Sequence, residues 1–545
     1  MRENRRTMTK IRRTGQTGLL LYCVLFISVC LTPLLGLLFG LDSPNLEKRT
    51  LAQKPSWTTD DKFNLSFTSQ FDSYFTDQFT FRSWLIGGWH SINQILLQRS
   101  GSSRVIAGKE GWLFYQDTLD DYLGDPVLDS IALKRLDRVL FLQQEWLANQ
   151  GIPFIFVVVP NKNTIYPEWM PDHYQPIRSE GNLEQWMNTR SALAQIDLTA
   201  TLRTDALANR QTVLYHQTDS HWNNLGAARA ADAMLAAMHD LLPELPADSL
   251  ADQVWQPRQD WQGDLAVMLD PSGPAPDWQY YPEAPEPFRY VRPIKSLEDI
   301  KILTTAPDGR YHLLMFRDSF ANALIPMLSP RFAQVTYSRA LPYDYSLVVS
   351  TQKVSANNPL TDVVVLEIVE RNLPLLLETP PRMPASLIQA DGADELGVLS
   401  LSSADAGAAA DAAIAQQVTV MGELDQNWLK LTGAWYDQTD SAAIDRVAIG
   451  FSSLTDFLKN GSTVAAGGDL QAVFLEAFPI CNPDDLKKID QADQLETGES
   501  AAGMPVGGFT LYLEPGQWTT GPQDLVVAAH DTNGWKTKVL RITLP

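Results

Sequence analysis

The sequence predicts an α/β domain with a parallel sheet, followed by a β-sandwich and preceded by a membrane-spanning helix. Three patterns carry this prediction. A long apolar segment lies near the start of the chain. Continuous apolar runs alternate with helical patterns between Arg104 and Arg371, as in parallel α/β sheets. Beyond about residue 416, short runs of β type are separated by Gly, Asn and Asp, as in sandwiches.

The apolar segment Gly18–Gly40 has the length of a transmembrane helix. No charged residue occurs between Arg13 and Asp42, and about 20 apolar residues are enough to cross a bilayer. A cleaved signal peptide is the alternative, but its apolar core is usually about 7–15 residues and ends at a small-residue site that is missing here. Because a basic cluster precedes the segment, we expect residues 1–17 to form a cytoplasmic tail and residues 18–41 an uncleaved, single-pass signal anchor in the cell membrane. The remaining domains are then extracytoplasmic.

Residues 42–100 are predicted to form a stem and an amphipathic helix. The stem is polar and punctuated by prolines, and aromatic residues then recur at three- and four-residue steps from Asn64 to Leu97. This spacing is helical, with one apolar face that we expect to pack against the next domain.

Three continuous apolar runs predict strands that are buried on both faces: Ile152–Pro160, Tyr311–Phe316 and Asp362–Glu370. Helices are predicted over Lys134–Gln150 and Leu225–Leu242. Buried strands that alternate with helices give a parallel sheet flanked by helices, which we assign to residues 101–385.

The composition changes near Ala390. Residues 386–415 are rich in Ala, Asp, Gly and Ser, which predicts a linker with few contacts across it. Residues 416–545 contain a series of short β-type runs, so we predict a separate β-sandwich there.

Charge and cysteine content exclude some classes of protein. The formal net charge is −21, and the basic cluster at the start makes the rest still more acidic, so we expect no nucleic acid partner. Of the three cysteines, Cys23 and Cys30 lie in the apolar segment, so Cys481 has no disulfide partner in the exported part. Neither a P-loop nor a dinucleotide fingerprint is found, and we expect no cofactor.

The strongest chemical indication is Ser319, in the run Arg317-Asp318-Ser319-Phe320. This serine follows a buried strand and precedes a helical pattern, so it is expected on a tight turn at the carboxyl end of the sheet. There the N–H groups of a helix N-terminus favour negative charge, as an acyl-transfer nucleophile requires. The alternative is a structural role, because serine and aspartate at such a junction commonly only cap a helix.

A second indication is the pair Asp219 and His221, directly before a predicted helix. A serine nucleophile needs a base, and the base needs an acidic group that fixes its tautomer. Three other roles remain open: Asp219 as a helix cap, His221 as a buried core residue, and a metal site that includes His216. Only seven histidines occur and no further His or Cys pair has ligand spacing, so we expect no metal.

Six motifs follow one another over roughly residues 64–373: FDSYFTDQFTFR, VIAGKEGWLFY, VVVPNKNTIYPEWMP, TDSHWNNLGA, MFRDSFANALIPML and VVVLEIVERNL. Together they resemble the alginate O-acetyltransferase family of the AlgX/AlgJ type. The resemblance implies an SGNH-hydrolase-like fold in which Ser319 is the nucleophile, His221 the base and Asp219 the residue that orients the histidine. The Asp/His motif precedes the serine, as in that family and unlike ordinary SGNH esterases.

One position departs from the family pattern. The glycine that usually precedes Asp-Ser is Arg317 here, so the turn cannot use the freedom of glycine at positive φ. The backbone N–H of Ser319 is the expected first oxyanion donor. Candidates for the second donor are Asn161, Lys162 and Asn163, which follow a buried strand.

The resemblance implies a membrane-anchored extracytoplasmic O-acetyltransferase that modifies hydroxyls of a cell-envelope or exported polysaccharide through an acyl-enzyme. It also implies a multi-pass membrane O-acyltransferase as the partner that donates the acetyl group. Two alternatives remain: a polysaccharide O-acetyl esterase of the same fold, and a non-catalytic polysaccharide-binding scaffold. The final sandwich resembles modules appended to cell-envelope glycan enzymes, with candidate sugar contacts, or alternatively core residues, at Trp428, Trp435, Trp518 and Trp535.

Overall fold

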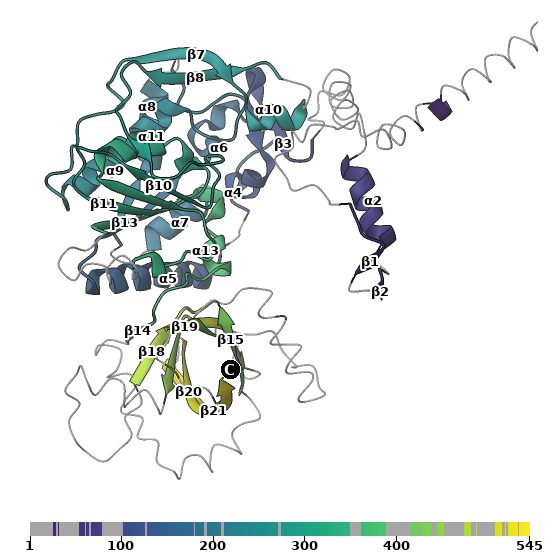
Figure 1. Ribbon diagram of the computed structural model, residues 1–545, viewed down its shortest axis with the longest axis vertical. Coiled ribbons are helices and arrows are strands. Elements are labelled where there is room, and N and C mark those ends of the chain that lie inside the picture. The colour runs from purple at the N-terminus through teal and green to yellow at the C-terminus, as the bar shows by residue number, and fades with distance from the viewer. Residues whose placement is uncertain are drawn as a thin grey trace, which may run out of the picture.

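The computed structural model describes residues 102–387 with gaps at 126–127, 179, 190–192, 209–211, 271–273 and 349–360. It also describes residues 26–28, 31, 54–59, 62–64, 67–78, 416–425, 428–437, 444–451, 473–480, 487, 507–514, 518, 521–531 and 534–544. Figure 1 shows two bodies, an α/β domain and a C-terminal pair of sheets, with helix α5 (Ser130–Asn149) at the boundary between them.

A seven-stranded sheet forms the centre of the α/β domain, in the order β6-β5-β13-β11-β12-β10-β9. The strands that run parallel to their neighbours are β6 (Gln195–Asp197), β5 (Phe154–Val159), β13 (Val363–Val369), β11 (His312–Phe316) and β12 (Gln334–Ser338). The predicted buried strands are therefore present and adjacent.

The sheet is mixed, and the prediction of a wholly parallel sheet is wrong at one edge. Strand β10 (Lys301–Thr305) runs antiparallel to both of its neighbours, β12 and β9 (Arg289–Tyr290). The connection from β10 to β11, residues 306–311, is too short for the crossover that keeps successive strands parallel. The chain therefore reverses direction there.

Helices cover both faces of the sheet. Alternate residues of β5 point to opposite sides, so Ile155 and Val157 join one hydrophobic cluster and Phe154 and Phe156 the other. Helices α8 (Leu198–Ala208) and α9 (Asn224–His239) contribute to the first cluster, and α5 and α7 (Asn182–Thr189) to the second.

The other elements of this domain are short and lie around the sheet: β3 (Val105–Ala107), β4 (Leu113–Tyr115), α4 (Leu119–Leu123), α6 (Lys162–Ile165), β7 (Trp255–Trp261), α10 (Asp264–Leu269), β8 (Asp277–Pro282), α11 (Ile325–Leu328) and α13 (Leu375–Glu378). The helical pattern predicted after Ser319 is only a single 3₁₀ turn followed by α11. Pro326, which has no N–H to donate, lies in the first turn of α11.

The N-terminal predictions fall largely outside the described residues, as do the cytoplasmic tail and most of the linker. Of the predicted transmembrane segment, only residues 26–28 and 31 are described. Within the described ranges, no helix combines the length and the apolar character that a bilayer crossing needs. Before the α/β domain the structure places β1 (Thr58–Thr59), β2 (Lys62–Phe63) and helix α2 (Phe67–Gln78), which belongs to the predicted amphipathic segment.

The C-terminal part consists of two antiparallel sheets. One contains β14 (Ser386–Leu387), β18 (Val473–Ala477), β17 (Arg446–Phe451), β20 (Gly521–Asp531) and β21 (Gly534–Leu544). The other contains β15 (Gln416–Asp425), β16 (Trp428–Asp437) and β19 (Gly507–Leu513). Side chains from both sheets, such as Ile449 and Leu511, share one hydrophobic cluster.

Two of the four tryptophans that were candidate sugar contacts can be placed: Trp428 belongs to the interior, and Trp518 is half-buried. Trp428 is buried, with its ring 6.4 Å from that of Tyr512, and Trp518 packs against the hydrophobic cluster. The side chains of Trp435 and Trp535 lie outside the described residues. Trp428 is therefore a core residue and not an exposed sugar contact, whereas Trp518 keeps part of its surface exposed.

More contacts join the two bodies than the sequence predicts. Glu476 of β18 is buried and accepts a hydrogen bond from Arg138 of α5 at 2.7 Å and another from Arg446 at 3.0 Å. Phe478 and Ile480 belong to the hydrophobic cluster of α5. Although burial opposes ionisation, the two guanidinium groups hold the pKa of Glu476 below its usual value.

Glu476→Ala should lower the stability of the protein by about 3 kcal/mol, because it leaves Arg138 and Arg446 without their carboxylate at the contact between the two bodies. In calorimetry, the α/β domain and the C-terminal sheets should then unfold in two separate transitions. The first of them should occur at a lower temperature than the unfolding of the wild-type protein. As a matched control, Glu423→Ala removes an ion pair of 3.4 Å whose carboxylate is 41% exposed, and it should change little. Identical unfolding curves for the two variants would contradict this account of the contact.

Candidate active site

Residues 317–320, here called the Ser319 turn, connect β11 to the 3₁₀ helix η4 (Phe320–Asn322). Asp318 ties this turn to β13, because its carboxylate accepts the N–H of Phe320 and the N–H of Val369, both at 2.8 Å. Ser319 has ordinary helical angles, φ −72° and ψ −23°. Among the described residues other than glycine, only Glu110 has a positive φ, so the turn does not require the glycine that the family pattern has at position 317.

Arg317 instead supports the turn with its side chain. The buried guanidinium donates to the carbonyl of Asp318 at 3.1 Å and to the Asn322 side chain at 2.6 Å. Its second terminal nitrogen donates to the carbonyl of Leu297 at 2.6 Å. Arg317 thus connects the turn and the end of η4 to the loop of Leu297, which glycine could not do.

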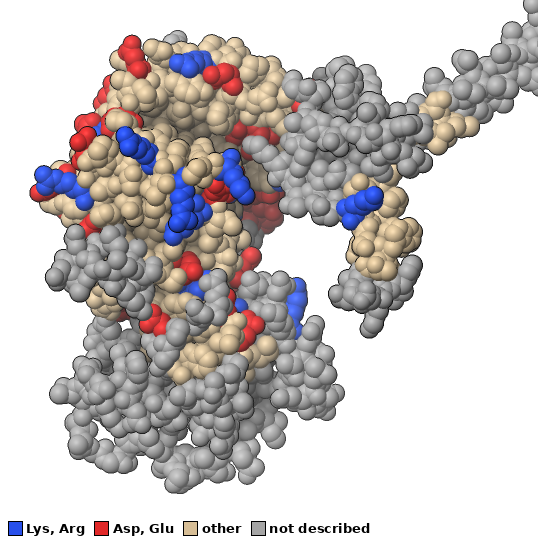
Figure 2. Space-filling model, in the orientation of Figure 1, with Lys and Arg blue, Asp and Glu red and all other residues tan. Residues whose placement is uncertain are grey.

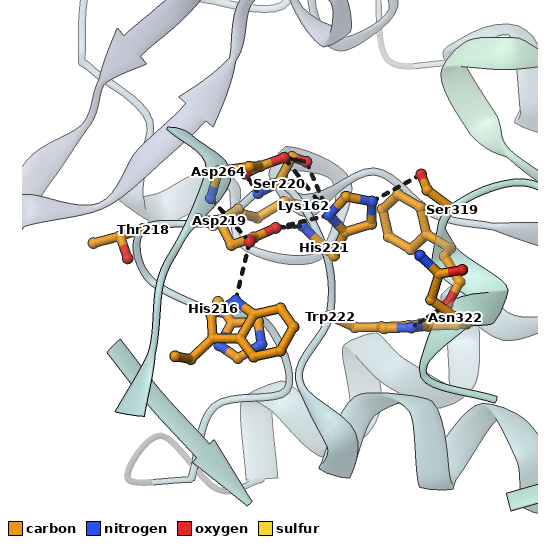
Figure 3. Close-up of polar contacts among 12 residues, drawn as sticks. Lys162, His216, Thr218, Asp219, Ser220, His221, Trp222, Asp264, Ser319 and Asn322 are labelled. Atoms are coloured by element: carbon orange, nitrogen blue, oxygen red, sulfur yellow. Dashed lines mark hydrogen bonds and ion pairs between the residues drawn. The ribbon is translucent and has the colours of Figure 1, made fainter. Parts of the chain in front are cut away.

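His221 lies opposite Ser319 and joins it to Asp219 (Figure 3). The Nε2 atom of His221 is 2.8 Å from Ser319 Oγ, and its Nδ1 atom is 2.7 Å from Asp219 Oδ1. A β-bridge between Tyr215 and Trp222 closes the loop that carries the aspartate and the histidine. The structure therefore brings the three predicted residues into one hydrogen-bonded chain.

Trp222 connects that loop to the Ser319 turn. Its indole N–H donates to the carbonyl of Phe320 at 3.0 Å, and the Phe320 ring centroid lies 4.6 Å from that of His221. The side chain of Asn223 accepts hydrogen bonds in the first turn of α9. The helix cap is therefore Asn223 and not Asp219, which removes one of the alternative roles for the aspartate.

Asp219 is buried and accepts four hydrogen bonds. Oδ1 receives the backbone N–H of His221 at 2.9 Å as well as the ring nitrogen, and Oδ2 receives the indole N–H of Trp261 and the N–H of Asp264, both at 3.0 Å. Burial alone would raise the pKa of Asp219. The hydrogen bond and charge of His221 outweigh burial and hold it well below its usual range, so the carboxylate is ionised.

The same contact changes the basicity of His221. Burial lowers the pKa of a histidine, but the hydrogen bond and the negative charge of Asp219 outweigh it and raise the pKa of His221 above its usual value. The side chain keeps 23% of its surface exposed, so a substrate can reach it. Because Asp219 accepts at Nδ1, Nε2 of the neutral ring is left to accept the proton of Ser319.

Sequence reasoning missed a second carboxylate at this site, Asp264. It accepts the N–H and the hydroxyl of Ser220, both at 2.7 Å, and its Oδ2 atom is 3.7 Å from Nδ1 of His221. Burial and the charge of Asp219 raise the pKa of Asp264. The only signal in the sequence is an aspartate after Gly263 at the start of a short apolar helix, which is too common to indicate a site.

Gly263 allows the Asp264 loop to reach the loop of the histidine. A Cβ atom at this position would lie 2.3 Å from the carbonyl oxygen of Thr218, which no side chain can tolerate. The same oxygen accepts the N–H of Ala266 at 3.0 Å. This close backbone approach brings the N–H of Asp264 within hydrogen-bond distance of Asp219.

The three predicted oxyanion candidates are buried and donate elsewhere. Lys162 donates to the carbonyls of Leu113, Gln217 and Asp219 at 2.6–3.0 Å, and burial lowers the pKa of this lysine to about 7. The side chain of Asn163 donates to Thr118, and that of Asn161 donates to Asp121. Lys162 thus holds the loop of Asp219 by its backbone carbonyls. None of the three predicted candidates donates to Ser319.

The structure does not bring His216 together with Asp219 and His221 as the ligands of a metal site. His216 donates from Nδ1 to the carbonyl of Trp278 at 2.9 Å and stacks on Trp261, with ring centroids 4.8 Å apart. Among the described residues, the group able to place three potential ligand atoms within 4.8 Å consists of Asp219, His221 and Asp264. In that group the contacting atoms of Asp219 and His221 already share a hydrogen bond.

Residues 105–306 match the family described as ALGX, the SGNH hydrolase-like domain of acetyltransferase AlgX. This range contains Asp219 and His221 and ends before Ser319. The chain is 28% identical to a probable alginate O-acetylase AlgJ of Pseudomonas aeruginosa over 201 residues, which is 36% of this chain and 49% of the relative. It is 26% identical to that of Pseudomonas syringae pv. tomato over 250 residues, 45% of this chain and 60% of the relative.

Solved structures with detectable similarity include the O-acetyltransferase domain of Pseudomonas putida AlgJ, at 20% identity and a TM-score of 0.33, covering 50% of this chain and 92% of that one. Bacillus cereus PatB1 with a sulfonyl adduct has 16% identity and a TM-score of 0.37, covering 49% of this chain and 94% of that one. The matched range defines an SGNH hydrolase-like domain. This domain is of the AlgX/AlgJ type, so the family resemblance predicted from the motifs is confirmed. The chain spans about half the length of the curated relatives it matches.

Asp219→Asn should lower the pKa of His221, because it removes the negative charge that raises this pKa. The imidazole should then lose its proton at a lower pH than in the wild-type protein, as followed by NMR titration of the histidine ring. Asp264→Asn should shift the pKa in the same direction by less, since only its charge acts on His221. The control Asp260→Asn changes an exposed residue of β7 and should leave the titration of His221 unchanged. An unchanged titration of His221 in Asp219→Asn would contradict the electrostatic account of this site.

Proposed function

We propose that this protein is a membrane-anchored O-acetyltransferase that acts on hydroxyls of a cell-envelope or exported polysaccharide. The observation that carries the proposal is the hydrogen-bonded chain from Ser319 through His221 to Asp219. Asp219 and His221 lie within the range that matches the SGNH hydrolase-like domain, and Ser319 follows it in sequence. The curated relatives of this range are named as probable alginate O-acetylases. A serine, a histidine and an ionised aspartate in this order are the groups that acyl transfer needs.

The first half of the reaction forms an acetyl-enzyme. Ser319 Oγ attacks the carbonyl carbon of the acetyl donor while Nε2 of His221 takes the hydroxyl proton. Asp219 stabilises the imidazolium that results. The backbone N–H of Ser319 has no acceptor within the described part of the chain, so it is available to the developing oxyanion. Collapse of the intermediate expels the leaving group, which takes the proton from His221.

The second half transfers the acetyl group to the polysaccharide. A sugar hydroxyl gives its proton to Nε2 of His221 and attacks the carbonyl carbon of acetyl-Ser319. When the second intermediate collapses, the bond to Oγ breaks and Ser319 regains its proton from His221. A sugar ester and free enzyme result. An esterase would differ only in using water at this step.

The acetyl donor and the location follow from the same proposal. No CoA or nucleotide motif occurs in the sequence, so a multi-pass membrane O-acyltransferase is the proposed partner that presents the acetyl group. The predicted anchor at residues 18–41 would hold the domain beside such a partner, outside the cytoplasm.

The charge on the face shown in Figure 2 is of mixed sign, which supports the proposal of a polysaccharide acceptor. On the face in Figure 2, Lys and Arg side chains of the described residues are interspersed with Asp and Glu over the α/β domain. The described residues therefore form no continuous basic surface on this face, and the net charge of the chain is −21.

Ser319→Ala and His221→Ala should each lower the hydrolysis of a small chromogenic acetyl ester by about 10³-fold or more, with little further loss in the double variant, because the residues act as one unit. Steady-state kinetics on folded proteins measure this effect. Ser130→Ala, which changes an exposed serine at the start of α5 in the same domain, is the matched control and should retain wild-type rates.

Full activity of a folded Ser319→Ala protein would show that the nucleophile is another residue. A second measurement separates transferase from esterase: the enzyme is given an isotopically labelled acetyl ester with and without an oligosaccharide acceptor. We expect the label on the oligosaccharide. Label recovered only as acetate would make the protein an esterase.

A further inference from the structure

Arg371 lies beside the Ser319 turn although the two are distant in sequence. Strand β13 pairs in parallel with β11, so the residues after each strand emerge at the same edge of the sheet. Arg371 is in the 3₁₀ turn that follows β13. Val369 and Asn372, on either side of Arg371 in sequence, both donate hydrogen bonds to the carboxylate of Asp318. The backbone N–H of Val369 does so at 2.8 Å and the side chain of Asn372 at 3.4 Å.

Two aromatic rings hold the guanidinium of Arg371. Its Cζ atom is 5.4 Å from the ring centroid of Tyr115 and 5.4 Å from that of Phe320. Phe320 directly follows Ser319, and its ring is also in contact with the His221 ring at 4.6 Å. A single phenyl ring therefore touches both the arginine and the histidine of the site.

The charge of Arg371 has no carboxylate partner. Within the described residues no Asp or Glu oxygen lies within ion-pair distance of its guanidinium, and its one side-chain hydrogen bond is a long one of 3.4 Å to Asn161. Other arginines of the domain are paired, for example Arg331 with Asp248 at 2.6 Å and Arg382 with Asp425 at 2.7 Å. A half-buried guanidinium with unused donors is suited to bind a negatively charged oxygen.

We infer that Arg371 is the second oxyanion donor of this site, acting together with the backbone N–H of Ser319. The inference rests on the proposed acyl transfer. It takes the role that was expected of Asn161, Lys162 or Asn163, whose side-chain nitrogens donate to Asp121, to backbone carbonyls and to Thr118 instead.

The role of Arg371 in the reaction is electrostatic. When Ser319 Oγ attacks the acetyl carbonyl, the π electron pair of the C=O bond moves to the carbonyl oxygen, and the proton of the hydroxyl goes to His221. Arg371 neither gains nor loses a proton; its N–H groups bind the new negative charge until the pair returns and the leaving group departs. Its positive charge also offsets the two nearby carboxylates, Asp219 and Asp264, which would otherwise oppose an oxyanion.

Arg371→Met tests this inference, because methionine keeps an apolar stem between the two rings but provides no donor or charge. On a small neutral acetyl ester we expect kcat to fall about 10²-fold with little change in KM. Arg371→Lys should retain part of the rate, and added guanidinium ion should restore part of the rate of Arg371→Met. The acidic limb of the pH profile should move to higher pH, since Arg371 lowers the pKa of His221.

Arg258→Met is the matched control. Arg258 also lies over a ring, that of Tyr281 at 4.7 Å, but it is an exposed residue of β7, and its loss should leave kcat unchanged. Wild-type kcat of Arg371→Met on the neutral ester would overturn the inference. An effect confined to the KM for an acidic oligosaccharide would also overturn it and make Arg371 a contact for a substrate carboxylate. Failure of the acyl-transfer proposal itself would appear separately, as activity retained by Ser319→Ala.

Discussion

The site depends on one buried carboxylate, that of Asp219, and on the four hydrogen bonds that it accepts. A carboxylate has about four lone-pair positions, so these bonds satisfy it without water and keep it ionised. The ionised form fixes the tautomer of His221, which leaves Nε2 as the acceptor for the hydroxyl of Ser319. If this carboxylate were misplaced, the histidine would lose both its orientation and its raised pKa.

The surrounding fold is arranged to keep Asp219 in position. The buried Lys162, the first residue of α6, donates to the carbonyl oxygen of Asp219 and to two further carbonyls. The loop at Gly263 approaches the carbonyl of Thr218 so closely that only a glycine fits there. This loop supplies two of the four donors to Asp219, the indole N–H of Trp261 and the backbone N–H of Asp264. Parallel pairing of β11 with β13 then places Ser319 and Arg371 at the same sheet edge, facing the histidine loop.

What the sequence could predict was local. Three strands were predictable from continuous apolar runs, and Ser319, His221 and Asp219 from short motifs that resemble one family. The role of Lys162 could not be predicted, because the sequence does not indicate whether the ammonium group of a lysine after a strand faces solvent or backbone carbonyls. Asp264 and Arg371 join the site only through tertiary contacts, and the reversed β10 and the buried Trp428 likewise depend on packing that periodicity does not encode.

The most direct test of the central claim is to find the acetyl group on the enzyme. The protein is mixed with a chromogenic acetyl ester, quenched in acid within the first turnover, digested and examined by mass spectrometry. The account predicts one added acetyl group on the peptide that contains Ser319, located on that serine and lost when an oligosaccharide acceptor is present before the quench. Turnover without any acetylated Ser319, or with the acetyl group on a different residue, would contradict it.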